Sequence, residues 1–205
     1  MDRRTSLKWV LLASAAWPLL DHPSAGAAGT AEAVGYGSDP NLMRVYRPGE
    51  LWPLIMTPAQ RRLAGILSDL ILPADEHSPS ASSIGVVDFV DEWVSAPYPV
   101  HQQDRAIVLD GFVWLDAAAT RRQGLGFSEL ATADQLGICD GICDASRATP
   151  ALALPVRFFA RYRDLTAGAY YSSSAGRKDV GYIGNVPLAR FEGPPPALLK
   201  ALGLE

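Results

Sequence analysis

Three adjacent side chains in a polar loop are the first candidates for acid–base chemistry. Asp75, Glu76 and His77 stand together in the stretch ADEHSPSASSIG. A carboxylate beside an imidazole can tune the pKa of that imidazole for proton transfer. Adjacent loop residues point in different directions, however, and no nucleophile or second base is placed with these three. The pattern therefore favours a solvated loop over a catalytic site.

The two cysteines of the chain, Cys139 and Cys143, raise the question of a disulfide. Their i, i+4 spacing puts both sulfurs on one face of an expected helix, where helix geometry disfavours a bridge. Gly137 and Gly141 could loosen that helix enough for a disulfide to form in an oxidising compartment. Two small buried apolar side chains are an equally good interpretation, so the disulfide stays open.

Known signatures of catalysis and of cofactor binding are missing from the sequence. It contains no GxGxxG after a strand, no P-loop, no GxSxG and no HExxH. The cysteines have no further ligands at metal-binding spacing, and no CxxCH attaches a haem. The remaining histidines, His22 and His101, have no partners in sequence. We therefore predict no catalytic, cofactor-binding or metal-binding residue in this chain.

Apolar residues at helical spacing organise the middle of the chain. Thr57 as N-cap and Pro58 at the first helical position begin a helix that Pro73 ends. Further helices are expected over 86–95, about 102–122, about 133–146 with Thr132 as cap, 156 to about 171, and 197–204. Helical periodicity is lost after Ser172. No alternating strand is convincing, so we predict an all-α fold: an irregular bundle of about five helices with an extended N-terminal arm and a Gly/Pro-rich C-terminal strap.

Length and composition limit the classes of partner. The chain has 205 residues, 48% of them hydrophobic, which is enough to form a core. A net charge of −4 gives it no electrostatic reason to bind nucleic acid. We expect a signal segment over 1–28, an irregular arm over 29–56, and a helical domain with a C-terminal docking segment over 57–205.

The first residues have the pattern of an export signal. A positive region is followed by the apolar run from Trp9 to Leu20 and by small residues suited to cleavage. An uncleaved anchor is the alternative. The stretch RRTSLK is similar to the twin-arginine motif, which exports proteins that are already folded. The residues that carry this similarity are Arg3, Arg4, Leu7 and Lys8, whereas Ser6 stands where an aromatic residue is common.

The tail GRKDVGYIGNVPLARFEGPPP combines glycine and proline with large apolar side chains. Such a segment either folds back on the bundle or docks on a partner through aromatic anchors. We favour docking, with Val180 to Leu188 as its centre. The expected partner contacts are Asp179, Gly181, Tyr182, Gly184, Asn185, Pro187 and Phe191.

Three stretches together resemble the gluconate 2-dehydrogenase subunit 3 family. They are ILPAD after the first helix, FF followed by YRDLT, and, most specifically, KDVGYIGN. The resemblance extends from about residue 57 to the end of the chain, and a twin-arginine leader is also typical of this family. It implies a small subunit with no known catalytic residue.

The resemblance also implies partners and a location. Such subunits accompany an exported large subunit of the glucose–methanol–choline oxidoreductase family, which holds FAD and often passes electrons to a multi-haem cytochrome c. The large subunit usually lacks an export signal and leaves the cytoplasm with the small one through the twin-arginine translocase. The expected location is the periplasm, with or without association to the inner membrane through the complex. The oxidised sugar is not readable from this chain.

Two other classes of function remain open at this point. One is a stand-alone helical periplasmic enzyme that uses the loop of Asp75, Glu76 and His77. The other is an independent periplasmic binding or scaffold protein, which would be a stable monomer without a large exposed apolar patch.

Overall fold

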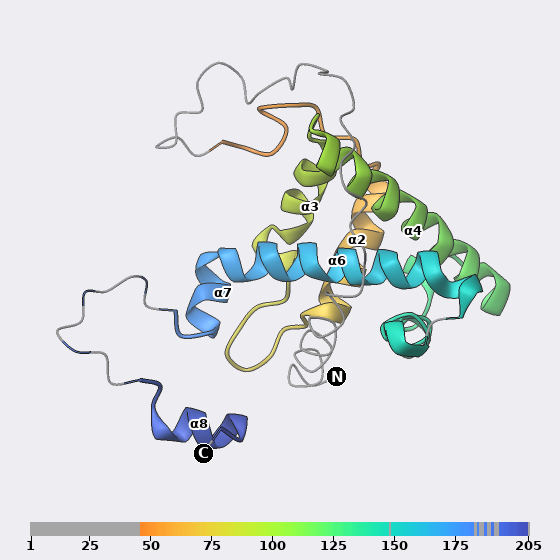
Figure 1. Cartoon of the computed structure of the whole chain (residues 1–205). Helices are drawn as coiled ribbons and strands as arrows, with labels where there is room; N and C mark the ends of the chain where they lie inside the picture. Colours follow the sequence, from red (N-terminus) through yellow and green to blue (C-terminus); the bar gives the residue numbers. More distant parts are fainter. Residues whose placement is uncertain are drawn as a thin grey trace, which may run out of the picture.

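The computed structural model describes residues 46–147, 149–182, 184, 187, 190 and 193–204, and every regular element within them is helical (Figure 1). The all-α fold is thus confirmed, with seven α-helices in place of about five. They are α2 Pro58–Ile71, α3 Val86–Ser95, α4 Pro99–Gln123, α5 Thr132–Cys139, α6 Ala153–Ser172, α7 Ser174–Asp179 and α8 Pro196–Leu202. Single 3₁₀ turns cover Ser82–Ile84, Phe127–Glu129, Ala145–Arg147 and Pro150–Leu152. None of the described helices is both long enough and apolar enough to cross a bilayer.

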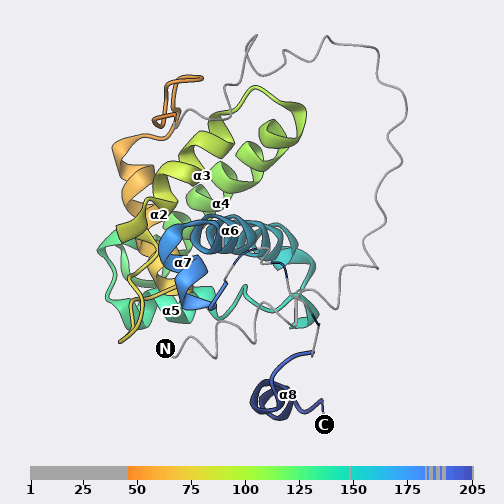
Figure 2. The same ribbon diagram turned by 90° about the vertical axis from the view of Figure 1, so that its left-hand side faces the viewer.

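Helix α6 is the centre of the arrangement, and α2, α3, α4 and α7 all contact it. In Figure 1 it runs across the view, with α7 folded back at its C-terminal end. Figure 2 looks along α6 and shows α3 and α4 above it, with α5 and α7 below. The helices thus surround one hydrophobic core, which includes Leu67, Val90, Leu115 and Phe158.

Tyr162 ties the middle of α6 to α2 inside this core. Its side chain is fully buried, and its hydroxyl donates a hydrogen bond of 2.8 Å to the carbonyl oxygen of Ala64. The same hydroxyl lies 3.0 Å from the hydroxyl of Ser68. Burial raises the pKa of Tyr162. The buried hydroxyl of Tyr162 thus has hydrogen-bond partners on α2, so it holds α6 against α2 without the cost of an unpaired buried polar group.

The start of α2 confirms the predicted cap. The Thr57 hydroxyl accepts the backbone N–H of Gln60 at 3.2 Å, and the Gln60 side chain accepts the backbone N–H of Thr57 at 2.8 Å. This reciprocal capping box satisfies two N–H groups that the first turn leaves without partners. Pro58 needs no such partner because it has no N–H. The helix ends at Ile71, two residues before Pro73.

The predicted boundary of the long helix α4 was wrong at its N-terminus. It begins at Pro99, three residues before the predicted start at about residue 102. A proline is tolerated in the first turn, because that turn leaves the backbone N–H without a helical partner anyway. The predicted stripe of Val108, Phe112, Leu115 and Ala119 is buried as expected.

Helix α5 is shorter than predicted. It ends at Cys139, whereas we expected helix as far as residue 146. The backbone N–H groups of Gly141 and Ile142 bond to the carbonyls of Ile138 and Cys139, three residues back, so the chain tightens into turns. Thr132 is the first helical residue and not the cap, which is Ala131.

The expected loss of helix after Ser172 was also wrong. After a single break at Ser173, α7 adds six helical residues at a new angle. The Ser173 hydroxyl accepts the backbone N–H of Gly176 at 3.0 Å and so caps the new helix. The short serine-led stretch before GRKD was the local signal for this element.

Candidate functional site

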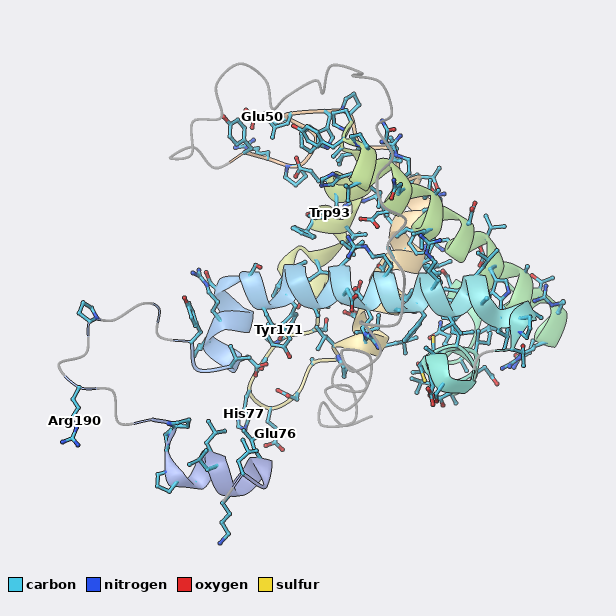
Figure 3. The ribbon with its side chains drawn as sticks, viewed as in Figure 1. Glu50, Glu76, His77, Trp93, Tyr171 and Arg190 are labelled. Atoms are coloured by element: carbon cyan, nitrogen blue, oxygen red, sulfur yellow. The ribbon has the colours of Figure 1, made fainter. Side chains whose placement is uncertain are left out.

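The loop between α2 and α3 is organised by Asp75. Its carboxylate accepts the backbone N–H groups of His77 at 2.8 Å and of Ser78 at 2.9 Å. The Asp75 N–H in turn donates to the carbonyl of Ser78 at 3.0 Å. Figure 3 shows Glu76 and His77 at the outer turn of this loop, and both are exposed. The Asp75 carboxylate therefore organises the backbone of this loop.

Helix α7 reverses the direction of the chain in little space. A Cβ on Gly176 would lie 2.1 Å from the carbonyl oxygen of Tyr170, so only glycine allows this approach. At the other end, Gly181 has φ of +65° and the N–H of Tyr182 bonds to the carbonyl of Arg177 at 2.9 Å. The last helical turn is thereby closed by a left-handed glycine.

Two contacts join the α2–α3 loop to the region of α7. The hydroxyl of Ser78 donates to the carboxylate of Asp179, and the hydroxyl of Tyr170 donates to the carbonyl of Pro79 at 2.8 Å. The two segments are distant in sequence, because Ser78 and Asp179 are separated by 101 positions. We call the surface formed by residues 73–79 and 176–182 the α7 corner. The α7 corner contains the last three residues of the ILPAD motif and the KDVGY stretch. These are two of the most distinctive motifs of the sequence.

Large apolar side chains are exposed where the chain leaves the α7 corner. Val180 is 60% exposed and Tyr182 is 57% exposed. Exposed apolar groups next to fixed polar contacts are typical of surfaces that bind other proteins. Asp179 is different, because its carboxylate is already engaged by Ser78 within the chain.

The other predicted contact residues are placed as follows. Gly184 has a left-handed φ of +82°, and Pro187 is exposed. Asn185 and Phe191 lie outside the described residues, as do Arg3, Arg4, Leu7 and Lys8 of the export signal.

The cysteines do not share a helix, because α5 ends at Cys139. Both are thiols in the structure. Burial raises the pKa of the Cys139 thiol to about 12, and the Cys143 thiol lies 3.5 Å from the carbonyl oxygen of Asp140. The Cys139 thiol is therefore almost entirely protonated at neutral pH, and a protonated thiol is a poor nucleophile.

A second polar cluster, not predicted from the sequence, joins α3, α4 and α6. The guanidinium of Arg161 donates twice to the carboxylate of Asp104, at 2.7 and 2.6 Å. The indole N–H of Trp93 donates to the same carboxylate at 2.8 Å, and Arg161 lies 5.7 Å from the centre of a Trp93 ring. Burial alone would raise the pKa of Asp104, but the hydrogen bonds from Arg161 and Trp93 outweigh it and lower that pKa. The cluster fixes the crossing of the three helices.

His101 packs on this cluster and gives it a pH dependence. Its ring lies 4.3 Å from Trp93 and 5.4 Å from Tyr98, and its Nδ1 is buried without a hydrogen-bond partner among the described residues. Burial lowers the pKa of His101 below its usual 6.5, with Arg161 adding to the effect and Asp104 opposing it. Between the lowered pKa and 6.5 the unfolded chain therefore binds more protons than the folded one, so stability falls as pH drops.

We expect the urea midpoint to decrease from pH 7.5 to 5.5, and to decrease less in His101→Phe. The phenyl ring keeps the packing on Trp93 but removes the titration. All other titratable groups are the same in the two proteins, so the difference between their pH responses reports on His101. An equal loss of stability in both proteins would show that His101 does not titrate in this way. The effect of Asp104 begins only near pH 4 and lies outside this window.

The structure thus defines a small all-α protein in which the most distinctive motifs of the sequence meet on one exposed corner. The described residues include no group of three or more metal-ligating side chains placed to hold an ion. The chain belongs to the gluconate 2-dehydrogenase subunit 3 family, whose model matches residues 58–190. No curated protein and no solved structure matches it. The family name indicates an accessory role in a dehydrogenase complex and association with its other subunits.

Proposed function

We propose that this chain is the non-catalytic small subunit of an exported FAD-dependent sugar or sugar-acid dehydrogenase. In this proposal it binds the flavoprotein large subunit, supports its folding, and provides the twin-arginine signal for export of both chains to the periplasm. FAD and the substrate pocket belong to the large subunit, and a cytochrome c subunit with haem would accept the electrons in complexes that contain one. The family membership supports the role of a dehydrogenase subunit. The identity of the partner as an FAD-dependent flavoprotein is the part that we propose.

One observation carries this proposal. The KDVGY stretch and the α2–α3 loop, which are distant in sequence, are fastened together at the α7 corner by Ser78 and Asp179. That polar attachment holds the chain so that Val180 and Tyr182 face solvent. Apolar and aromatic side chains held rigidly at a surface lose little entropy on binding, which makes them effective anchors. We therefore place the large subunit on this corner and on the strap that follows it.

The test is co-purification of the large subunit with the full-length tagged chain. Val180→Asp combined with Tyr182→Asp should weaken the complex roughly 100-fold, because two interface anchors of about 1–2 kcal/mol each are replaced by charges. Val100→Asp is the matched control, since Val100 is also 60% exposed but lies in the first turn of α4. Figure 1 shows that this turn is far from α7. The readout is flavin absorbance and dye-linked sugar oxidation in the purified fraction.

The outcomes separate the proposed function from its alternatives. A wild-type chain that purifies without any flavoprotein, or a chain that holds flavin by itself, would contradict an accessory subunit. Dehydrogenase activity of the chain without a partner would support the stand-alone enzyme instead. If the corner variant and the Val100 control co-purify the large subunit equally well, the chain still has this partner but does not bind it through the α7 corner. Circular dichroism of each variant checks that the helices are intact.

A further inference from the structure

A pocket lies at the other end of α6 from the α7 corner. Its volume is about 190 Å³, and it is lined by the second half of α4, the end of α5 with the following turn, and the 3₁₀ turn Pro150–Leu152. Ala118, Ile138 and Ile142 are buried and form an apolar floor. Trp114 and Leu152 complete its apolar lining. A hollow of this size and character accepts one aromatic or branched aliphatic group.

Two guanidinium groups also line this pocket. Arg121 and Arg122 lie in the last turn of α4, and no acidic side chain lines the pocket with them. Neither takes part in an ion pair among the described residues. The side chain of Arg122 extends to α5, where its Nη1 lies 3.7 Å from the position that a Cβ on Gly137 would take. The dipole of α4 favours cations at this end, but it does not account for an apolar hollow beside them.

The combination selects a ligand with two chemical parts. An apolar group would fill the hollow, and a carboxylate would accept hydrogen bonds from the guanidinium groups in the geometry that arginine offers. A sugar or a sugar acid fits poorly, because its hydroxyl groups would meet the apolar floor without hydrogen-bond partners. A polypeptide supplies the required pair whenever an aromatic or aliphatic residue stands next to an aspartate or glutamate.

We propose that this pocket is a second anchor point for the large subunit and receives an apolar side chain that neighbours a carboxylate on that partner. The inference rests on the proposed function. Charge complementarity is its first support, because two exposed cations with no ion pair among the described residues stand beside the apolar hollow and favour an anionic group there. The distance between the pocket and the α7 corner is its second support. Helix α6 has 20 residues and is therefore about 30 Å long.

The spacing of the two anchors suits one binding partner. An interface of standard size covers about 800 Å² on each partner and so is about 30 Å across. Both views place α5, which provides one wall of the pocket, on the same side of α6 as α7 (Figures 1 and 2). One partner surface lying along this side of α6 would therefore reach from the α7 corner to the pocket.

The experiment measures affinity of the large subunit for full-length variants of this chain. Arg121→Gln with Arg122→Gln keeps the side chains long and polar but removes both charges. We expect about tenfold weaker binding at low salt, and a smaller difference at 0.5 M salt because screening already weakens the pairs. Arg47→Gln with Arg62→Gln changes the net charge equally at two exposed arginines outside the pocket, and should have less than a twofold effect.

A second variant tests the hollow without touching charge. Ala118→Met would occupy the floor of the pocket and should also weaken binding about tenfold, with no salt dependence. Tyr182→Asp in the same assay reports on the corner alone. If it weakens binding while both pocket variants bind like wild type, the pocket is not an anchor and the proposed function stands. If the two arginine pairs have equal effects, only general charge attraction is at work. If the wild-type chain binds no flavoprotein, both proposals fail.

Discussion

Gly111→Ala is expected to lower the free energy of unfolding by about 3 kcal/mol, at the upper end of the cost of overpacking a core. A Cβ at this position would lie 1.9 Å from Cδ2 and 2.0 Å from Cγ of Phe158. The Phe158 ring is buried and packs edge-on against Phe112 at 5.9 Å, so it cannot turn away freely. The new methyl group would therefore push α4 and α6 apart where they cross.

Gly168→Ala is the control for this substitution. Gly168 lies in α6, is exposed, and has open space where a Cβ would be. There alanine should stabilise the helix by up to about 1 kcal/mol, because glycine has the lower helix propensity. Urea unfolding of both variants gives opposite signs if packing decides the effect at Gly111. Restoring stability to Gly111→Ala by adding Phe158→Leu would identify the ring as the cause. A loss below 0.5 kcal/mol in Gly111→Ala would contradict the close crossing.

Arg3→Lys combined with Arg4→Lys should remove nearly all dehydrogenase activity from the periplasm and leave it in the cytoplasm. This follows from the proposed function, in which one signal serves two chains. Lysine keeps the positive charge, and a general secretory signal needs no more than that charge. The twin-arginine route is addressed by the arginine pair itself and carries folded, cofactor-loaded cargo. Activity of fractionated cells, measured with a dye acceptor, reports the location.

Arg44→Lys is the matched control, because it also exchanges arginine for lysine but lies outside the twin-arginine stretch. It should leave the distribution of activity unchanged. Periplasmic activity that survives the double substitution would count against export of the large subunit by this signal. Activity lost from both compartments would instead indicate that the large subunit is degraded when export fails, and immunodetection of both chains distinguishes that result.

The sequence predicted the helices well where the signals are local. Thr57 and Pro58 define the start of α2 within two residues, and the structure has the same cap. The α3 bounds and the buried stripe of α4 also agree, because apolar spacing is itself a local property. The errors in the prediction lie at helix ends, where residues that favour a helix stand next to residues that interrupt one. Glycines at 137 and 141 weakened α5, and a single serine cap was enough to restart a helix after Ser173.

The candidate site was predicted only in part. The tail around Val180 and Tyr182 was expected to be available to a partner, and the structure does expose both side chains. Its attachment to the α2–α3 loop was not predicted, nor was the role of the Asp75 carboxylate as acceptor of two backbone N–H groups. Asp104 and Arg161 likewise looked like ordinary surface charges, because nothing near either residue in sequence indicates the other.

The sequence by itself determined the helical class, the position of most helices and the family of this protein. Capping, proline placement and apolar period act within a few residues, so they can be read without the fold. The tertiary structure alone decided that Ser78 reaches Asp179 and that Arg161 reaches Asp104 across 57 positions. It also placed Arg121 and Arg122 beside an apolar hollow. These pairings depend on how the helices cross. The close approach of Phe158 to Gly111 likewise depends on the packing of α6 against α4, so the sequence does not indicate it.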